Sequence, residues 1–347
     1  MRIALGLIGS VLILVVIYDV VWTTLRLTGG GPLTTQVTNT LWHLAVRVTK
    51  SHRSLSVAGF CIVLFTVLLW IGLTWISWTL VLNWNEGAVV DAQTGEPANF
   101  WARLYFAGYT LITMGNGDYR PVGSVWQVLT AVASGNGFFL ITLIITYLLP
   151  LVTEEIKRRQ IASHIHALGP TPQDILLRAW NGSGFGLLPN HLVELTFPMM
   201  ALAQGHLAYP VLHCFHSLQR ETALAPSIAA LDEALTLLEA SAVEQRPDPV
   251  AVYPLREAIE RFLSTLQKAH LEPKSQPPPL PSLDRLRDAG VPTTDDGELR
   301  RIVEKLSKRR RLLLGLVEQE GWRWEDVTVA RYDDETGAST RSPSPSP

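Results

Sequence analysis

The sequence has few cysteines and no excess of either charge. Cys61 lies in an apolar run and Cys214 in the polar half of the chain, settings too different to predict a disulfide framework or a thiolate metal site. The 29 basic and 31 acidic residues nearly cancel, so the composition indicates neither nucleic acid nor an acidic substrate as a partner. No grouping of side chains predicts an enzyme active site, and no cofactor is expected.

Charged residues make up only 17% of the chain and are scarce in its first 150 positions, where aliphatic residues and tryptophan dominate. Three segments there are apolar and long enough to span a bilayer as helices: Ile3 to Trp22, Val57 to Leu82, and Val122 to Val152. The first could instead be a signal peptide, but it is long for one and no small-residue cleavage site follows it. The sequence therefore predicts a multi-pass protein of the cell membrane (plasma or inner membrane).

The loop between the first and second apolar segments carries only basic charges. Arg26, Arg47, Lys50 and Arg53 lie there without an acidic residue, which by the positive-inside rule places this loop in the cytoplasm. The N-terminus is then outside and the C-terminus is cytoplasmic. Apolar residues at helical spacing from Val37 to Val48 predict an amphipathic helix, which either lies on the inner membrane surface or packs against the other helices.

Asp19 is the one charged residue within the three apolar segments. A lone carboxylate is costly in lipid, so we expect Asp19 near the membrane interface or facing other helices. A packing role is favoured over a role in proton transfer.

The chain between the second and third segments contains irregular, polar residues, which do not suit a lipid-facing helix. Phe100 to Ile112 is apolar and aromatic but too short to cross, which predicts a half-helix that enters the membrane and stops. The residues that follow are Thr113, Met114, Gly115, Asn116, Gly117 and Asp118. Such backbone is tolerated at membrane depth only where protein buries it or water reaches it. Glycines would let successive carbonyls face one axis, because alternate residues must then adopt left-handed backbone.

This stretch resembles the pore loop of potassium channels with two membrane helices, whose filter follows the pattern Thr-Val-Gly-Tyr-Gly-Asp. The pattern is matched at Thr113, Gly115, Gly117 and Asp118. Met114 is a conservative change, and Asn116 replaces the aromatic residue. The resemblance covers residues 57–152 and extends loosely to bacterial ion-channel proteins with an extra N-terminal helix and a helical cytoplasmic region.

The resemblance implies a homotetrameric cation channel, because one pore loop supplies one quarter of a filter. Permeant K⁺ would bind at the backbone carbonyls of the filter residues Thr113 to Asp118. No segment carries a basic residue at every third position, so a voltage sensor is not expected. The alternative function is a non-conducting, channel-like membrane sensor whose cytoplasmic domain binds a partner; the sequence does not identify a cytoplasmic regulator.

Asn116 leaves the selectivity of such a filter open. The aromatic residue of the pattern packs behind the filter, and asparagine is too small to fill that volume. Its amide must find hydrogen-bond partners or recruit water. A looser filter that also passes Na⁺ is the first expectation, and selectivity retained through a hydrogen bond to Tyr109 or Trp101 is the second.

The third apolar segment contains residues at which an inner helix could bend. Gly135, Gly137 and Pro150 are predicted as a gating hinge, although the two glycines could equally serve helix packing. Asn136 is expected to face a water-filled cavity, with a hydrogen bond to a neighbouring helix as the alternative.

The chain after Thr153 shows helical periodicity with few strand signals. Thr171 before Pro172 predicts a capped helix start, and two apolar faces follow. These faces are formed by Ile228, Leu231, Leu235 and Leu238, and by Leu299, Ile302, Leu306, Leu313 and Leu316. Residues 275–282, SQPPPLPS, predict a linker between two groups of helices.

Three further motifs in this half are discounted. GSGFG at 182–186 has no preceding strand and predicts a connector rather than a nucleotide-binding loop. The spacing of His206, His213, Cys214 and His216 matches no standard zinc site, so no zinc site is expected. The basic run from Lys308 to Arg311 predicts a solvated helix face, with contact to anionic lipid as the alternative.

The predicted fold is an all-α membrane protein with three transmembrane helices plus one re-entrant pore helix and filter loop, followed by an α-helical cytoplasmic domain. Four regions are predicted: 1–56 with the N-terminal helix and interfacial segment, 57–152 as the pore domain, 153–332 as the cytoplasmic domain, and 333–347 as a disordered tail.

Overall fold

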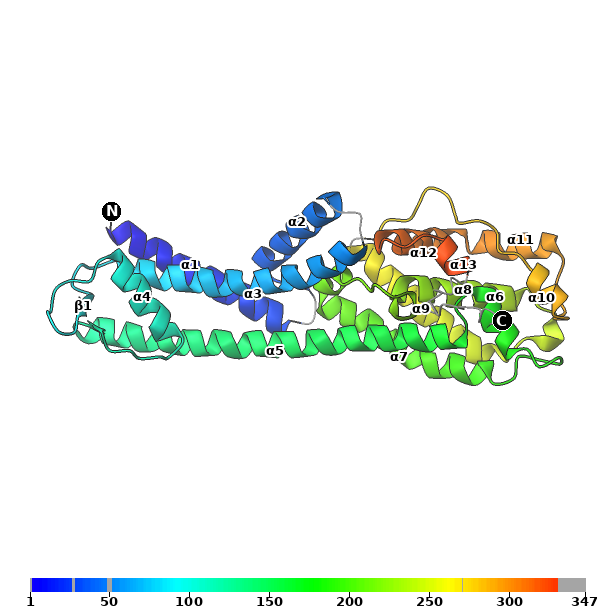
Figure 1. The fold of residues 1–347 in the computed structure, drawn as a ribbon, viewed down its shortest axis with the longest axis horizontal. Helices are drawn as coiled ribbons and strands as arrows, with labels where there is room; N and C mark the ends of the chain where they lie inside the picture. Colours follow the sequence, from blue (N-terminus) through cyan, green and yellow to red (C-terminus); the bar gives the residue numbers. More distant parts are fainter. Residues whose placement is uncertain (1, 27–28, 49–51, 270, 330–347) are drawn as a thin grey trace, which may run out of the picture.

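The computed structural model describes residues 2–26, 29–48, 52–269 and 271–329; the predicted tail lies outside them. It confirms the helical membrane fold. Three helices are long and apolar enough to cross a bilayer: α1 (Arg2–Leu25), α3 (His52–Leu82) and α5 (Ser124–Leu168). They form one end of an elongated molecule, and the helices from α6 onward form the other (Figure 1).

The carboxylate of Asp19 joins the first three helices. It is fully buried in α1 and accepts hydrogen bonds from the backbone N–H groups of Leu33 and Thr34, at 2.8 and 3.2 Å, where α2 (Pro32–Val48) begins. The Thr34 hydroxyl donates to it at 2.6 Å, and Nε1 of Trp70 on α3 donates at 3.1 Å. A carboxylate at this position satisfies free N–H groups of the first turn and interacts favourably with the helix dipole. The predicted packing role is confirmed.

Helix α2 has one buried face and one exposed face. Thr34, Thr38 and Trp42 follow one another at four-residue spacing and are buried against the bundle. Leu44 and Val48 are exposed. Packing against the other helices is therefore confirmed for one face, and the other presents apolar side chains that lipid can cover.

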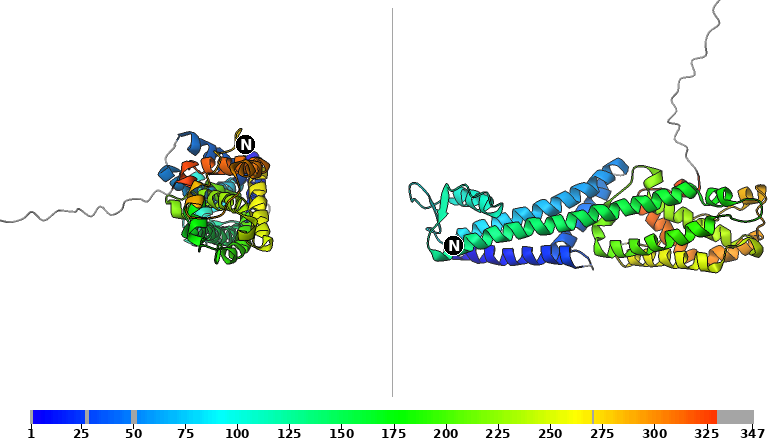
Figure 2. Two further views of the ribbon diagram at one scale, coloured as in Figure 1. Left: turned by 90° about the vertical axis from the view of Figure 1, so that its right-hand side faces the viewer. Right: turned by 90° about the horizontal axis from the view of Figure 1, so that it is seen from below.

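Helix α5 is continuous from the end of the molecule that carries the pore loop into the helical domain at the other end, as the view from below in Figure 2 shows. Its 45 residues correspond to about 68 Å at 1.5 Å per residue. The sequence predicted a span ending at Val152, but charged pairs prolong the helix, among them Glu155 with Arg159 one turn later. The predicted boundary between pore and cytoplasmic domains therefore falls inside one helix.

The C-terminal domain, which the sequence places in the cytoplasm, is helical throughout its described residues. Its α-helices are α6 (Pro172–Ala179), α7 (Leu188–Ala208), α8 (Leu224–Glu239), α9 (Pro249–Ala269), α10 (Asp284–Asp288), α11 (Asp296–Lys305), α12 (Ser307–Gln319) and α13 (Glu325–Thr328). Short 3₁₀ helices are η1 (Pro210–Cys214), η2 (Arg220–Thr222) and η3 (Val243–Gln245). The Thr171 side chain caps α6 as predicted, and 182–186 connects α6 to α7.

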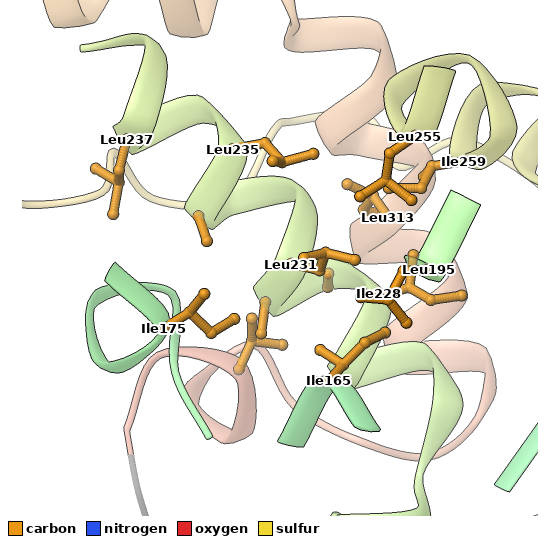
Figure 3. Close-up of a cluster of buried hydrophobic side chains, with 14 of the residues drawn as sticks. Ile165, Ile175, Leu195, Ile228, Leu231, Leu235, Leu237, Leu255, Ile259 and Leu313 are labelled. Atoms are coloured by element: carbon orange, nitrogen blue, oxygen red, sulfur yellow. The ribbon is translucent and has the colours of Figure 1, made fainter. Parts of the chain in front are cut away.

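Helix α8 occupies the centre of this domain. Every residue from Leu224 to Leu238 is buried. Figure 3 shows Ile228, Leu231 and Leu235 of α8 among side chains from surrounding helices. These neighbours include Ile165 of α5, Ile175 of α6, Leu195 of α7, Leu255 of α9 and Leu313 of α12. The predicted apolar face is buried, and so is the opposite face, which carries Asp232 and Glu233.

The buried carboxylates of α8 pair with the basic run of α12. Nε of Arg310 donates to Glu233 at 2.6 Å, and Nη2 of Arg309 lies 2.7 Å from Asp232. Arg310 is 1% exposed. The prediction of a solvated face at Lys308 to Arg311 is therefore wrong for these two arginines, because they pair with buried carboxylates of α8.

Arg310 also binds the proline-rich segment. Its guanidinium donates to the carbonyl oxygens of Pro278 and Pro279, at 3.2 and 2.7 Å. The helices before and after this segment share one hydrophobic core. Residues 275–282 thus connect two groups of helices that pack together, and do not separate them as expected.

The 3₁₀ helix η1 attaches the cytoplasmic domain to the membrane helices. Leu212 and Cys214 are fully buried in a cluster that also contains Ile62 of α3 and Tyr147 of α5. Arg158 of α5 donates to the Leu212 carbonyl oxygen at 2.7 Å. The two halves of the molecule are therefore packed directly against each other.

Removing the cation of the buried pair should destabilise the cytoplasmic domain. We expect Arg310→Met to lower the free energy of unfolding by about 3–5 kcal/mol, because Glu233 would remain buried without its partner. Burial raises the pKa of the Glu233 carboxyl. Arg310 opposes this rise, so its removal should raise the pKa further, and the variant then loses more stability than the native chain as the pH rises. The defect should therefore shrink from about pH 8 to about pH 5.

Thermal unfolding of the purified full chain at both pH values measures this effect. Arg301→Met is the matched control, since Arg301 is an exposed arginine of α11, and it should change stability by less than about 0.5 kcal/mol. A defect of Arg310→Met that is no larger than that of the control would contradict the expectation.

Candidate pore loop

The predicted half-helix is α4 (Phe100–Leu111), which packs closely against α3. It begins after Asn99, whose side chain accepts a hydrogen bond from the Ala102 N–H at 2.9 Å. Nε1 of Trp75 on α3 donates to the Leu104 carbonyl oxygen at 2.7 Å. A Cβ at Gly108 would lie 2.9 Å from the Trp75 ring, so only glycine permits this approach.

The C-terminal end of α4 rests on α5 at Gly137. A Cβ at Gly137 would lie 2.0 Å from the Leu111 carbonyl oxygen, whereas a Cβ at Gly135 would meet nothing within 4 Å. The packing alternative is therefore supported for Gly137. Helix α5 runs unbroken through Gly135, Gly137 and Pro150, and their role as a gating hinge stays a prediction.

The backbone after α4 alternates in handedness. Thr113, Gly115 and Gly117 have φ values of 58°, 62° and 82°, and the residues between them do not have positive φ. Among the described residues Thr113 is the only non-glycine residue with positive φ, a conformation that costs about 1–3 kcal/mol and tends to occur at functional sites. Such alternation lets successive carbonyls face the same side of the chain.

The carbonyl groups of this stretch have no internal partner. Within the described residues, none of the carbonyl oxygens from Thr113 to Gly117 accepts a hydrogen bond. The five residues are exposed in the single chain. At membrane depth such unpaired oxygens require water, another chain or a cation.

Both ends of the stretch are held. At the N-terminal end of the stretch, the Met114 N–H donates to the Tyr109 carbonyl oxygen at 2.9 Å. Just after its C-terminal end, β2 (Tyr119–Pro121) pairs antiparallel with β1 (Val89–Asp91), with Tyr119 opposite Asp91. The unpaired carbonyls are thus fixed between a helix and a small sheet.

Asn116 takes part in a closed set of hydrogen bonds with Tyr105 and Asp118. Its Nδ2 donates to the Tyr105 hydroxyl and, at 3.0 Å, to Oδ2 of Asp118. The Tyr105 hydroxyl donates to the same carboxylate oxygen at 3.1 Å. Asparagine therefore connects the filter stretch to α4 by hydrogen bonds, where an aromatic residue would do so by packing.

The hydrogen-bond partners predicted for Asn116 were wrong. The Tyr109 hydroxyl donates to the Tyr119 carbonyl oxygen at 2.9 Å, and Trp101 is 73% exposed. Tyr105 lies one turn before Tyr109 on the same face of α4, a spacing visible in the sequence. That shared face is the signal that could have identified Tyr105.

Asn136 also has a partner on another helix. Nε1 of Trp78 on α3 donates to its side-chain oxygen at 2.9 Å. The alternative of a hydrogen bond to a neighbouring helix is therefore confirmed, and the position of Asn136 at a water-filled cavity stays a prediction. A buried indole N–H usually requires such an acceptor.

Comparison with known proteins agrees with this geometry. The ion channel family matches residues 60–154, a range that includes α4, the filter stretch and most of α5. The uncharacterized membrane protein YdjJ of Bacillus subtilis (strain 168) is 32% identical over 319 residues, which cover 91% of this chain and 94% of that protein. No solved structure matches the chain.

The two glycines of α5 should respond in opposite ways to the same substitution. Gly137→Ala should destabilise the protein by about 1–3 kcal/mol, because its methyl group would clash with the Leu111 carbonyl. Gly135→Ala should be neutral or stabilising by up to about 1 kcal/mol, since glycine within a helix costs backbone entropy. Thermal unfolding of the two variants distinguishes them. Equal effects would show that the close contact of Gly137 with α4 does not determine stability.

Proposed function

The chain belongs to a family of membrane proteins with an ion-channel domain, and on this premise we propose that it forms a homotetrameric channel that conducts potassium ions passively. The observation that carries this proposal is the alternating left-handed backbone at Thr113, Gly115 and Gly117. That backbone presents successive carbonyls without internal partners, which is what a dehydrated cation requires.

The tetramer is proposed because the loop is incomplete in one chain. Polar, irregular backbone cannot face lipid, yet the filter stretch is exposed on the single chain. Other copies arranged around an axis would cover it and complete each ring of carbonyls. A native mass measurement in detergent tests the number of chains.

The chemistry we propose is limited to binding and orientation. Ions would lose water to carbonyl rings from Thr113 to Gly117, and the Thr113 hydroxyl would add a ring at the inner end. Helix α4 ends at Leu111 just before the filter, so the negative end of its dipole favours a cation there. The spanning segments lack a basic residue at every third position, which supports conduction without voltage gating.

The proposed orientation has the N-terminus outside and the cytoplasmic domain inside. The N-terminal end of α1 and the pore loop lie together, opposite the helical domain (Figure 1). An ion pair of 2.8 Å between Arg2 and Glu86 links α1 to the outer loop. Labelling a cysteine introduced at Gln93 with an impermeant reagent tests this orientation.

The hydrogen bonds of Asn116 support the second alternative for selectivity. Its amide N–H group is paired with Tyr105 and Asp118, so hydrogen bonds rather than aromatic packing tie the filter stretch to α4. We therefore propose a filter that still prefers K⁺ over Na⁺. A non-conducting sensor remains the rival function, and ion flux separates the two.

Conduction should depend on the backbone of Gly115. In liposomes, the purified protein should conduct K⁺, and Gly115→Ala should abolish most of the flux, because alanine disfavours positive φ. Gly182→Ala is the matched control, since Gly182 also has positive φ and open space but lies in the α6–α7 connector. Folded tetramers without flux would support the sensor instead.

Selectivity should depend on the Tyr105 hydroxyl. Tyr105→Phe removes one partner of Asn116 and one of Asp118, and we expect the ratio of K⁺ to Na⁺ permeability to fall about fivefold, equivalent to about 1 kcal/mol. Tyr18→Phe, on the exposed face of α1, should leave the ratio unchanged. An unchanged ratio in both variants would show that the network does not hold the filter.

A further inference from the structure

Helices α5 and α7 bring together three metal-ligating side chains. His164 comes from α5, and His191 and Glu194 come from α7. One candidate ligand atom from each lies within 4.8 Å of the other two. The His191 and Glu194 side chains are 40% and 67% exposed, so ions in solution can reach the cluster.

Nδ1 of His191, one of the candidate ligand atoms, is available to bind a metal. Nδ1 of His191 is shielded from solvent and has no hydrogen-bond partner among the described residues. It lies 3.7 Å from Oε2 of Glu194, too far for a hydrogen bond. The His164 and His191 rings meet edge to face, with centroids 5.7 Å apart.

The three ligand atoms lie within 4.8 Å of one another, which is wider than the spacing of ligands bound to one ion. With bonds of about 2.0–2.1 Å, two ligand atoms on a tetrahedral zinc ion lie about 3.4 Å apart. His191 and Glu194 are three residues apart on α7 and therefore share a face, which points both toward α5. Small side-chain rotations would bring all three ligand atoms to one ion.

We propose that His164, His191 and Glu194 bind a divalent transition-metal ion of the Zn²⁺ class. Two imidazoles and a carboxylate are a donor set that suits Zn²⁺ better than Mg²⁺ or Ca²⁺, which prefer oxygen ligands. Three protein ligands leave a fourth position for water. The site differs from the histidines around Cys214, for which the sequence predicted no zinc site.

A metal ion at this position would join two parts of the molecule. It would fasten the cytoplasmic end of α5, which begins beside the filter, to α7 in the cytoplasmic domain. A groove between these helices, lined by Lys157, Gln160 and Phe197, leads to His164. Any effect on ion flux rests on the proposed channel function, but binding itself does not.

The test is a zinc titration of the full-length, tag-free protein in detergent, in competition with a chromophoric chelator. We expect one Zn²⁺ per chain. The zinc affinity should fall at least tenfold in His164→Ala, His191→Ala and Glu194→Gln, because losing a residue that only orients a metal ligand already lowers affinity about 10–100-fold. His43→Ala is the matched control, since His43 is an exposed histidine of α2, and it should bind like the native chain.

A second readout keeps the test independent of folding defects and of ion conduction. Zn²⁺ should raise the unfolding temperature of the native chain and of His43→Ala but not of the three ligand variants. Equal zinc affinity in the native chain and all three ligand variants, or zinc binding lost equally in His43→Ala, would overturn the proposal. Absence of ion flux would contradict the channel but leave this measurement unaffected.

Discussion

The structure depends on one constraint, that backbone polar groups at membrane depth must be paired or meet water or an ion. The carbonyls from Thr113 to Gly117 have no internal partner in the described chain. The surrounding elements hold this stretch in place. Gly108 lets α4 approach α3, and Gly137 lets α5 approach the end of α4. The β1–β2 sheet and Asn116 fix the outer end.

Features set by local composition could be predicted from the sequence, and features set by distant partners could not. The apolar segments, the half-helix and the glycine pattern each lie in a short stretch. The partner of Arg310 is 77 residues away, and the three proposed metal ligands come from two helices. The length of α5 was underestimated because its cytoplasmic part is helical through charged pairs rather than apolar residues.

The two halves of the protein are connected by more than the covalent chain. Arg158 binds the η1 carbonyl of Leu212 and pairs with Glu320 near α12, at 3.2 Å. Leu212 itself is buried among membrane helices. Helix α5 is therefore one continuous element that contacts η1 near one end and the last residue of α4 near the other.

The buried pair between Glu233 and Arg310 has a consequence for biosynthesis. Glu233 is made 77 residues before Arg310, an interval of roughly 4–15 s at 5–20 residues per second. During that time Asp232 can pair with Arg256 of α9, which lies only 24 residues further along the chain, but Glu233 has no arginine partner yet. The pair that permits the burial of Glu233 can therefore form only after α12 has been made.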